Sequence, residues 1–250
     1  MTELPKIHTH TVTLSAALCN AQMEISPAML IQHIIETATE HADRLGVGFK
    51  RLSQGGNLWV LSRLALEMTR YPRVLETFAI HTWIENFNRH FSQRNFEITV
   101  DGTPIGYART IWVAIDMQTR RPADIGSLAD IAPTVIEKEC PILPPSKLRS
   151  LPEPTIVKDY TFQVSDIDFN RHVNSARYVE LFLNQFDLQT FDDNYLSRFD
   201  IVFQHEAHFG NQARVSSTPS DGGSLTSSIN VDGRDVCLSR STLTARSTKQ

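Results

Sequence analysis

Apolar residues recur with helical spacing once in each half of the chain, and runs typical of strands surround both stretches. In the first half, Ser26 and Pro27 form a typical helix start. A hydroxyl there can cap free backbone N–H groups, and proline fits the first helical turn. An apolar stripe then continues until Gly46 and Gly48, which favour a helix end. Its members are Ile31, Ile34, Ile35, Ala38, Ala42 and Leu45.

The same order of elements occurs twice. In the first half, a strand with a turn over residues 8–25 precedes this helix, and strands follow at 58–70, 77–86, 93–100 and 104–117. In the second half, a strand at 156–165 precedes a helix at 175–187, and strands follow at 197–209, 213–218, 224–231 and 236–245. Asp-Gly turn signals, such as the one at 232–233, favour hairpins between these strands.

A proline-rich stretch separates the two repeats and predicts a domain boundary. Residues 119–155 show no regular pattern apart from one short helix expected near 128–131. Connections of that length are unusual inside one compact unit. We therefore expect an N-terminal unit at 1–125, a linker at 126–155 and a C-terminal unit at 156–250. The predicted class is α+β, with each long helix wrapped by an antiparallel sheet. Two such units side by side would share one continuous sheet, with a ligand channel where they meet.

Polar residues concentrate just before the second helix and mark the candidate chemistry. Asp168, Asn170 and His172 alternate in what we interpret as an extended lead-in, so their side chains would point to the same side. Asn174 is a good N-cap for the helix. The helix start would add free N–H groups, which suit a carbonyl oxygen that gains negative charge. The structural alternative is that Asp168 and Asn170 only shape a turn.

Composition and charge narrow the functional classes. The formal net charge of −4 gives no reason to expect nucleic acid or an anionic membrane as a partner. No apolar run approaches the length of a membrane span. Three widely spaced cysteines are expected to be reduced thiols in a cytoplasmic protein.

Motifs for other chemistries are missing from the sequence. There is no serine elbow, no P-loop and no dinucleotide fingerprint, so we expect no cofactor. His205 and His208 flank Glu206 in a sequence that resembles a zinc motif with one residue missing. If this segment is a strand, the two histidines point to opposite faces, and we therefore expect no metal site there.

Three patches resemble the acyl-ACP thioesterases of plants and bacteria, which are tandem hot-dog proteins. They lie at residues 59–72, 112–122 and 168–178, and the third is the most specific. The resemblance covers about residues 8–245. It implies a hydrolase that releases free fatty acid from acyl carrier protein at the end of fatty acid biosynthesis. A tandem chain could be a monomer or a homodimer.

The resemblance also implies roles for particular residues. Asp168, Asn170 and His172 would be catalytic, together with Glu206 on a strand after the second helix. Asp168 would serve as base or nucleophile with help from Glu206, while Asn170 and His172 would orient water or donate to the oxyanion. Which carboxylate is the base stays open. Plant members carry a cysteine directly after the glutamate, whereas this chain has Ala207, so thiolate attack from that position is impossible.

Substrate and carrier contacts can also be predicted. The first helix and the strand after it would line the acyl tunnel, and Asn174 would contribute near the reacting end in addition to its capping role. The apolar residues of this set are Ile34, Ile35, Trp59 and Leu61. A basic rim would meet the acidic carrier protein. Its candidates are Arg120, Arg121, Lys147 and Arg149.

Three other functions remain open at this point. A tandem hot-dog chain could hydrolyse acyl-CoA instead of acyl carrier protein. A hot-dog dehydratase would act on 3-hydroxyacyl thioesters, and a non-enzymatic regulator would bind acyl thioesters without cleaving them. Tyr178, which lies in the third patch, is expected in the core and not in the chemistry.

Overall fold

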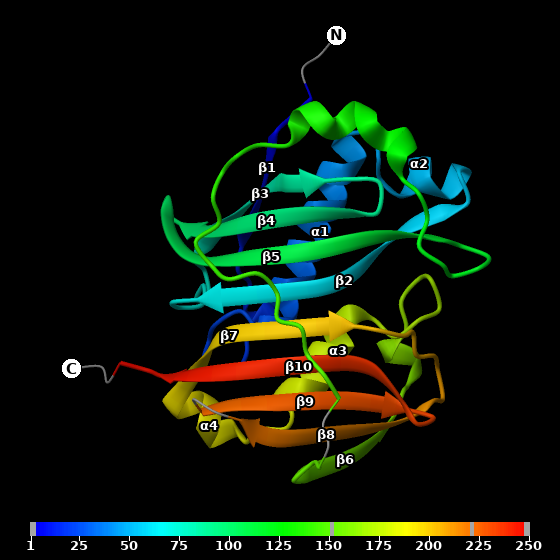
Figure 1. The fold of residues 1–250 in the computed structure, drawn as a ribbon. Coiled ribbons are helices and arrows are strands. Elements are labelled where there is room, and N and C mark those ends of the chain that lie inside the picture. The colour runs from blue at the N-terminus through cyan, green and yellow to red at the C-terminus, as the bar shows by residue number, and fades with distance from the viewer. Residues whose placement is uncertain (1–3, 151–152, 221–222, 248–250) are drawn as a thin grey trace.

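One antiparallel sheet of ten strands runs through the whole protein (Figure 1). The structure is a computed structural model, and it describes residues 4–150, 153–220 and 223–247. The strand order is β1-β3-β4-β5-β2-β7-β10-β9-β8-β6, so each half of the chain supplies five neighbouring strands. The first five are β1 (Ile7–Thr13), β2 (Asn57–Met68), β3 (Thr77–Phe87), β4 (Phe91–Val100) and β5 (Thr103–Asp116). The others are β6 (Ile156–Thr161), β7 (Asn194–Phe203), β8 (Gln212–Ser220), β9 (Ser224–Val231) and β10 (Arg234–Ala245).

Helices cover one face of this sheet. The α-helices are α1 (Pro27–Arg44), α2 (Phe49–Gln54), α3 (Ser175–Leu183) and α4 (Leu188–Asp193). Short 3₁₀ segments are η1 (Ala16–Leu18), η2 (Gly126–Thr134) and η3 (Val164–Asp166). The start of α1 is as predicted, because the Ser26 side chain accepts a hydrogen bond of 3.2 Å from the N–H of Met29 and Pro27 is the first helical residue. None of the described helices has the length and apolarity that a membrane crossing requires.

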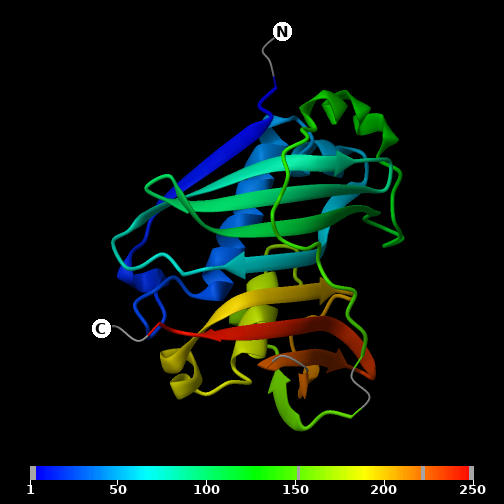
Figure 2. The same cartoon turned by 60° about the vertical axis from the view of Figure 1, so that its left-hand side comes forward.

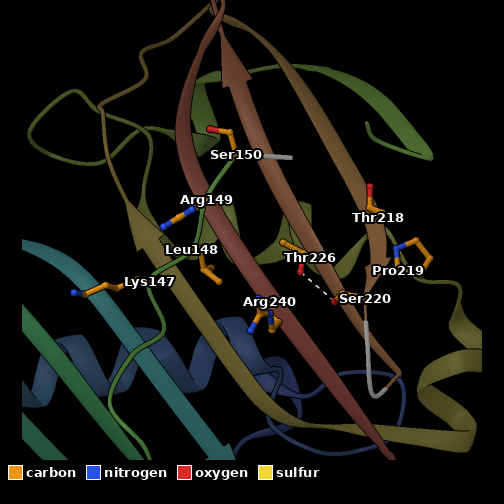
Figure 3. Close-up of a pocket in the computed structure, with 9 residues that line it drawn as sticks. All are labelled: Lys147, Leu148, Arg149, Ser150, Thr218, Pro219, Ser220, Thr226 and Arg240. Atoms are coloured by element: carbon orange, nitrogen blue, oxygen red, sulfur yellow. Dashed lines mark hydrogen bonds between the residues drawn. The ribbon is translucent and has the colours of Figure 1, made fainter. Parts of the chain in front are cut away.

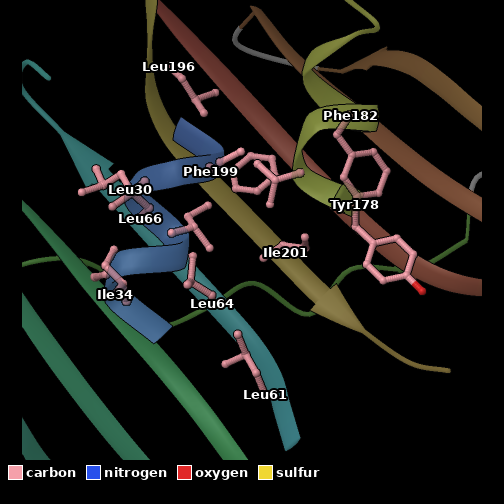
Figure 4. Packing of buried hydrophobic residues seen from close by; sticks show 14 of the residues in the cluster. Leu30, Ile34, Leu61, Leu64, Leu66, Tyr178, Phe182, Leu196, Phe199 and Ile201 are labelled. Atoms are coloured by element: carbon pink, nitrogen blue, oxygen red, sulfur yellow. The ribbon is translucent and has the colours of Figure 1, made fainter. Parts of the chain in front are cut away.

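The two halves join where β2 pairs with β7. Leu64 lies opposite Ile201 and Leu66 lies opposite Phe199 in this antiparallel register. On the helical face above this seam, α1 contacts α3, and a single apolar cluster extends through both halves (Figure 4). The predicted α+β class and the continuous sheet are confirmed.

The second predicted helix is shorter than expected. Residues 175–187 were predicted to form one helix, but α3 ends at Leu183 and α4 begins at Leu188. Asp187 explains the break, because its carboxylate accepts the Thr190 N–H at 2.7 Å and so favours a new helix start.

Residues 136–150 of the predicted linker are bound along the sheet, on the face opposite α1 and α3 (Figures 1 and 2), whereas η2 packs with residues of α1 and α2. The indole of Trp83 donates to the carbonyl of Lys138 at 3.0 Å, and Arg109 donates to the carbonyl of Ile142 at 3.1 Å. Further along, the Ser146 N–H donates to the buried Asp200 carboxylate at 2.8 Å. The short helix expected near 128–131 lies within η2. Residues 136–150 therefore cross from the N-terminal half onto the C-terminal half, and we call this segment the strap.

Candidate active site

The segment from Asp168 to His172 is a tight turn, and the prediction of an extended lead-in was wrong. Oδ1 of Asp168 accepts the backbone N–H groups of Asn170 at 2.8 Å and His172 at 3.1 Å. The Asp168 N–H donates to the carbonyl of His172 at 2.8 Å, and Arg171 has a φ of 68°. An aspartate that captures backbone N–H groups two and four residues on bends the chain, which alternation alone cannot show.

The turn separates the three predicted side chains. Asn170 is exposed, and its side chain makes no hydrogen bond within the described residues. His172 is partly buried, and Asp168 is half-buried beneath the turn. The structure therefore keeps Asp168 and His172 together and directs Asn170 to solvent.

Buried groups on both sides hold this turn in place. The Asp166 carboxylate is almost fully buried and accepts the Tyr160 hydroxyl at 2.9 Å and the Gln163 N–H at 2.7 Å. It also forms an ion pair with Arg177 in α3, with 2.6 Å between Oδ1 and Nε. On the other side, the N–H of Val173 donates to the carbonyl of Ala207 at 2.9 Å. The turn is thereby attached to the loop that carries Glu206.

Glu206 lies in a loop and not on a strand, which corrects the second site prediction. Strand β7 ends at Phe203, before the predicted strand end at residue 209. The loop brings Oε2 of Glu206 within 3.4 Å of Nε2 of His172. The predicted catalytic histidine and glutamate therefore do meet, although through a loop that the alternating pattern did not predict.

Arg120 reaches this pair from the other half of the chain. It follows β5, has a φ of 57°, and its guanidinium forms a direct ion pair with Glu206. The prediction placed Arg120 on a basic rim for the carrier protein, whereas the structure places it against the candidate catalytic glutamate. This contact depends on how the two halves join, so no local sequence signal could have found it.

His208 was set aside by the sequence argument and belongs beside the site. Its ring lies edge-to-face on that of His172, with centroids 5.1 Å apart and an interplanar angle of 65°. Residues 204–209 lie outside β7 and β8, so the strand alternation that predicted opposite faces for His205 and His208 does not apply. The two histidines around Glu206 were the available sequence signal, and the contact of His208 with His172 needed the structure.

The surroundings of His172 favour its neutral form. Burial is the largest cause that lowers the pKa of His172, and the nearby His208 and Arg120 lower it further, while Asp168 acts in the opposite direction. The imidazole is therefore mostly uncharged at neutral pH. A neutral imidazole next to a carboxylate can take a proton from water.

Aromatic residues from both halves meet at the same turn. Phe169 is 80% exposed, and its ring packs edge-to-face on Phe49 of α2, which is 51% exposed, with centroids 5.9 Å apart. Phenylalanines with this exposure form an apolar surface on the turn that carries His172.

The predicted acyl-lining residues do not form one surface. Ile34 and Leu61 are buried in the main core cluster, and Ile35 packs against it (Figure 4 labels Ile34 and Leu61). Trp59 packs on a second cluster and donates from its indole to the carbonyl of Val47 at 2.9 Å. Asn174 caps α3 by accepting the Ala176 N–H at 2.8 Å. At the seam, where the channel was predicted, buried side chains of both halves pack into one apolar cluster (Figure 4).

The other predicted basic residues lie in two places. Arg121 is exposed next to Arg120. Lys147 and Arg149 line a surface cavity of about 310 Å³ together with Arg240 of β10 (Figure 3). Arg240 pairs in register with Thr226, another lining residue, while the neighbouring Ser239 is fully buried. The cavity thus lies on the sheet face that the strap crosses, away from the helices.

Two hot-dog units fused through one sheet define a double hot-dog protein, and an imidazole, two carboxylates and a guanidinium gather at their junction as a candidate acid–base site. The chain belongs to the acyl-ACP thioesterase family. The model of the family's N-terminal domain matches residues 8–130, and that of its C-terminal domain matches residues 150–241.

Individual relatives agree with this assignment. An acyl-ACP thioesterase structure from Bacteroides thetaiotaomicron is 32% identical, with a TM-score of 0.88, over 96% of this chain and 98% of that one. The 12:0-ACP thioesterase structure from Umbellularia californica shares the fold, with a TM-score of 0.87 at 20% identity over 98% of this chain and 100% of that one. A chloroplastic palmitoyl-acyl carrier protein thioesterase from Gossypium hirsutum is 26% identical over 80% of this chain and 52% of its own length. The chain thus spans about half the length of the plant relatives it matches.

Proposed function

We propose that the protein hydrolyses fatty acyl thioesters of acyl carrier protein to free fatty acid and carrier. Family membership supports this activity, and relatives over both halves are named as acyl-carrier-protein thioesterases or hydrolases. The observation that carries the proposal is the contact between His172 and Glu206. Arg120, from the other half of the chain, forms an ion pair with the same glutamate. In this proposal the activity terminates acyl-chain synthesis in fatty acid biosynthesis.

In the proposed reaction, neutral His172 takes a proton from a water molecule as that water attacks the thioester carbonyl. Glu206 orients the imidazole and stabilises its charged form after proton transfer. The tetrahedral intermediate then expels the carrier's thiolate, which receives the proton back from His172. Proton transfer by a positioned side chain typically contributes about 10²- to 10⁴-fold in rate. Ala207 offers no thiol, so the carboxylates and the imidazole carry the chemistry.

Asp168 has a structural role and a proposed chemical one. One of its oxygens holds the turn, and its charge acts on His172 by raising that residue's pKa. It would therefore help stabilise the imidazolium as it forms. Asn170 would contact the substrate from the exposed side of the turn.

The carrier protein would approach the junction of the two halves. Arg121 is exposed beside the Arg120–Glu206 pair and is the proposed contact for an acidic partner. Arg120 would act on the site and not on the carrier. The described cysteines are free thiols, two of them buried, and we keep the cytoplasm as the proposed location.

The proposal is tested by thiol release from acyl thioesters of increasing chain length, each offered on acyl carrier protein and on CoA. We expect turnover on both, with a higher kcat/KM on the carrier protein, and a preferred chain length. Equal kcat/KM on the two would overturn the carrier assignment. Dehydration of 3-hydroxyacyl thioesters without thiol release would overturn hydrolysis itself.

A further inference from the structure

Imidazoles and carboxylates also cluster at the far edge of the N-terminal half, where the proposed reaction uses none of them. The cluster lies between β1, the outermost strand, and α1. It contains four of the nine histidines of the chain. Its members are His8, His10, His33, Glu36, Glu40 and His41.

The sequence explains why these groups meet. His8 and His10 are alternate residues of β1, so they share one face of the strand. His33, Glu36 and Glu40 are spaced by three and four residues along α1, so they share one face of the helix. Strand β1 packs beside α1 (Figure 2), which brings the two faces together.

Three of these side chains have the spacing of a metal site. The available ligand atoms of His10, His33 and Glu36 all lie within 4.8 Å of one another. The Nδ1 atom of His33 is 3.5 Å from Oε2 of Glu36, and the ring centroids of His10 and His33 are 5.8 Å apart. Ligand atoms around tetrahedral zinc are ~3.4 Å apart, so small side-chain rotations are enough to close the set.

His33 has ring nitrogens with no other use. Its side chain is 14% exposed, and both nitrogens are buried without a hydrogen bond to any described residue. Buried polar atoms normally have partners.

Glu40 holds the strand histidines in position. It accepts Nε2–H of His8 at 2.7 Å and Nδ1–H of His10 at 3.3 Å. When Nδ1 of His10 donates to a carboxylate, Nε2 is the nitrogen left to bind a cation. Metal-bound histidines commonly have such a carboxylate behind them, which fixes the ring and raises its basicity.

We propose that His10, His33 and Glu36 bind one Zn²⁺ ion, with Glu40 supporting His10 and water completing the coordination. Two imidazoles and one carboxylate are a ligand set that zinc accepts with tetrahedral geometry. The ion would fasten the edge strand β1 to α1. The site is separate from the proposed active site and does not depend on the proposed function.

The test is a titration of the chelator-treated full chain with ZnCl₂, followed by calorimetry and by the melting temperature. We expect one equivalent to bind and the melting temperature to rise. Co²⁺ in place of Zn²⁺ should give the intense visible absorption of a four-coordinate site. His33→Gln and Glu36→Gln should each weaken binding at least tenfold, and Glu40→Gln by about 10- to 100-fold.

His81→Gln is the matched control, because His81 lies on the neighbouring strand and contacts Thr9 of β1, outside the ligand set. It should bind Zn²⁺ like the parent. Absence of stoichiometric binding would overturn the proposal, as would unchanged binding in folded His33→Gln. If His33→Gln does not fold, unchanged Co²⁺ absorption in Glu36→Gln would overturn the proposal instead.

Discussion

Replacing Arg120 with glutamine removes a positive charge that the structure places beside the candidate acid–base pair. Arg120 lowers the pKa of His172, after burial and His208. Loss of the Arg120 guanidinium also removes the ion-pair partner of the Glu206 carboxylate. Oε2 of that carboxylate lies 3.4 Å from Nε2 of His172. Both changes favour the imidazolium, so the pKa of His172 must rise.

The size of this rise follows from Coulomb's law. A unit charge at roughly 6 Å in a medium with a dielectric constant of about 60 contributes about 0.9 kcal/mol. Arg120 and Glu206 are both 35% exposed, so screening by solvent and salt reduces this value. We expect the pKa of His172 to rise in Arg120→Gln, by less than this unscreened interaction corresponds to.

The assay is the pH dependence of kcat/KM for thiol release, which reports ionisations of the free enzyme. Hydrolysis needs neutral His172, so the rate falls at acid pH, with a midpoint below the usual histidine value of about 6.5. In Arg120→Gln this midpoint moves to higher pH, and the rate near pH 6 drops. Arg121→Gln, one residue away, should leave the midpoint in place. An unchanged or lowered midpoint in Arg120→Gln would refute the assigned electrostatics.

Two substitutions of Asp168 separate its structural role in the turn from its proposed chemical role. Asp168→Asn retains an acceptor oxygen for the turn and should keep the parent melting temperature while kcat falls about 100-fold. Asp168→Ala should also cost about 1–3 kcal/mol in free energy of unfolding by chemical denaturation; an equal loss in Asp168→Asn would contradict the turn assignment. Ile34→Phe adds volume at a fully buried position of the packed core, so it should cost about 1–3 kcal/mol in free energy of unfolding. An unchanged free energy of unfolding in Ile34→Phe would show that open space surrounds this residue.

The fold was predictable from sequence because its signals are local and repeated. The cap at Ser26, the apolar stripe that follows it and the Asp-Gly turns fix helix and strands within short windows. The continuous sheet followed from repetition of the pattern, whereas the pairing of β2 with β7 needed the structure. The second helix is shorter than its apolar stripe predicts, because Asp187 caps the start of a new helix.

The site was only partly predictable, because its geometry depends on loops and on the junction of the halves. Asp168 bends the chain through its own side chain, so alternation failed in that segment. The same rule was extended past Phe203, where β7 ends, and this misplaced Glu206 and His208. The pairing of Arg120 with Glu206 joins residues far apart in sequence and needed the structure.

The most direct test of the central claim is single-turnover thiol release from an acyl carrier protein thioester by His172→Ala. His205→Ala serves as the control, since His205 is an exposed histidine on the same loop as Glu206. We predict that His172→Ala keeps its fold by circular dichroism and loses about 10²- to 10⁴-fold in rate, while His205→Ala retains the parent rate. Parent-like release by a folded His172→Ala would contradict the account.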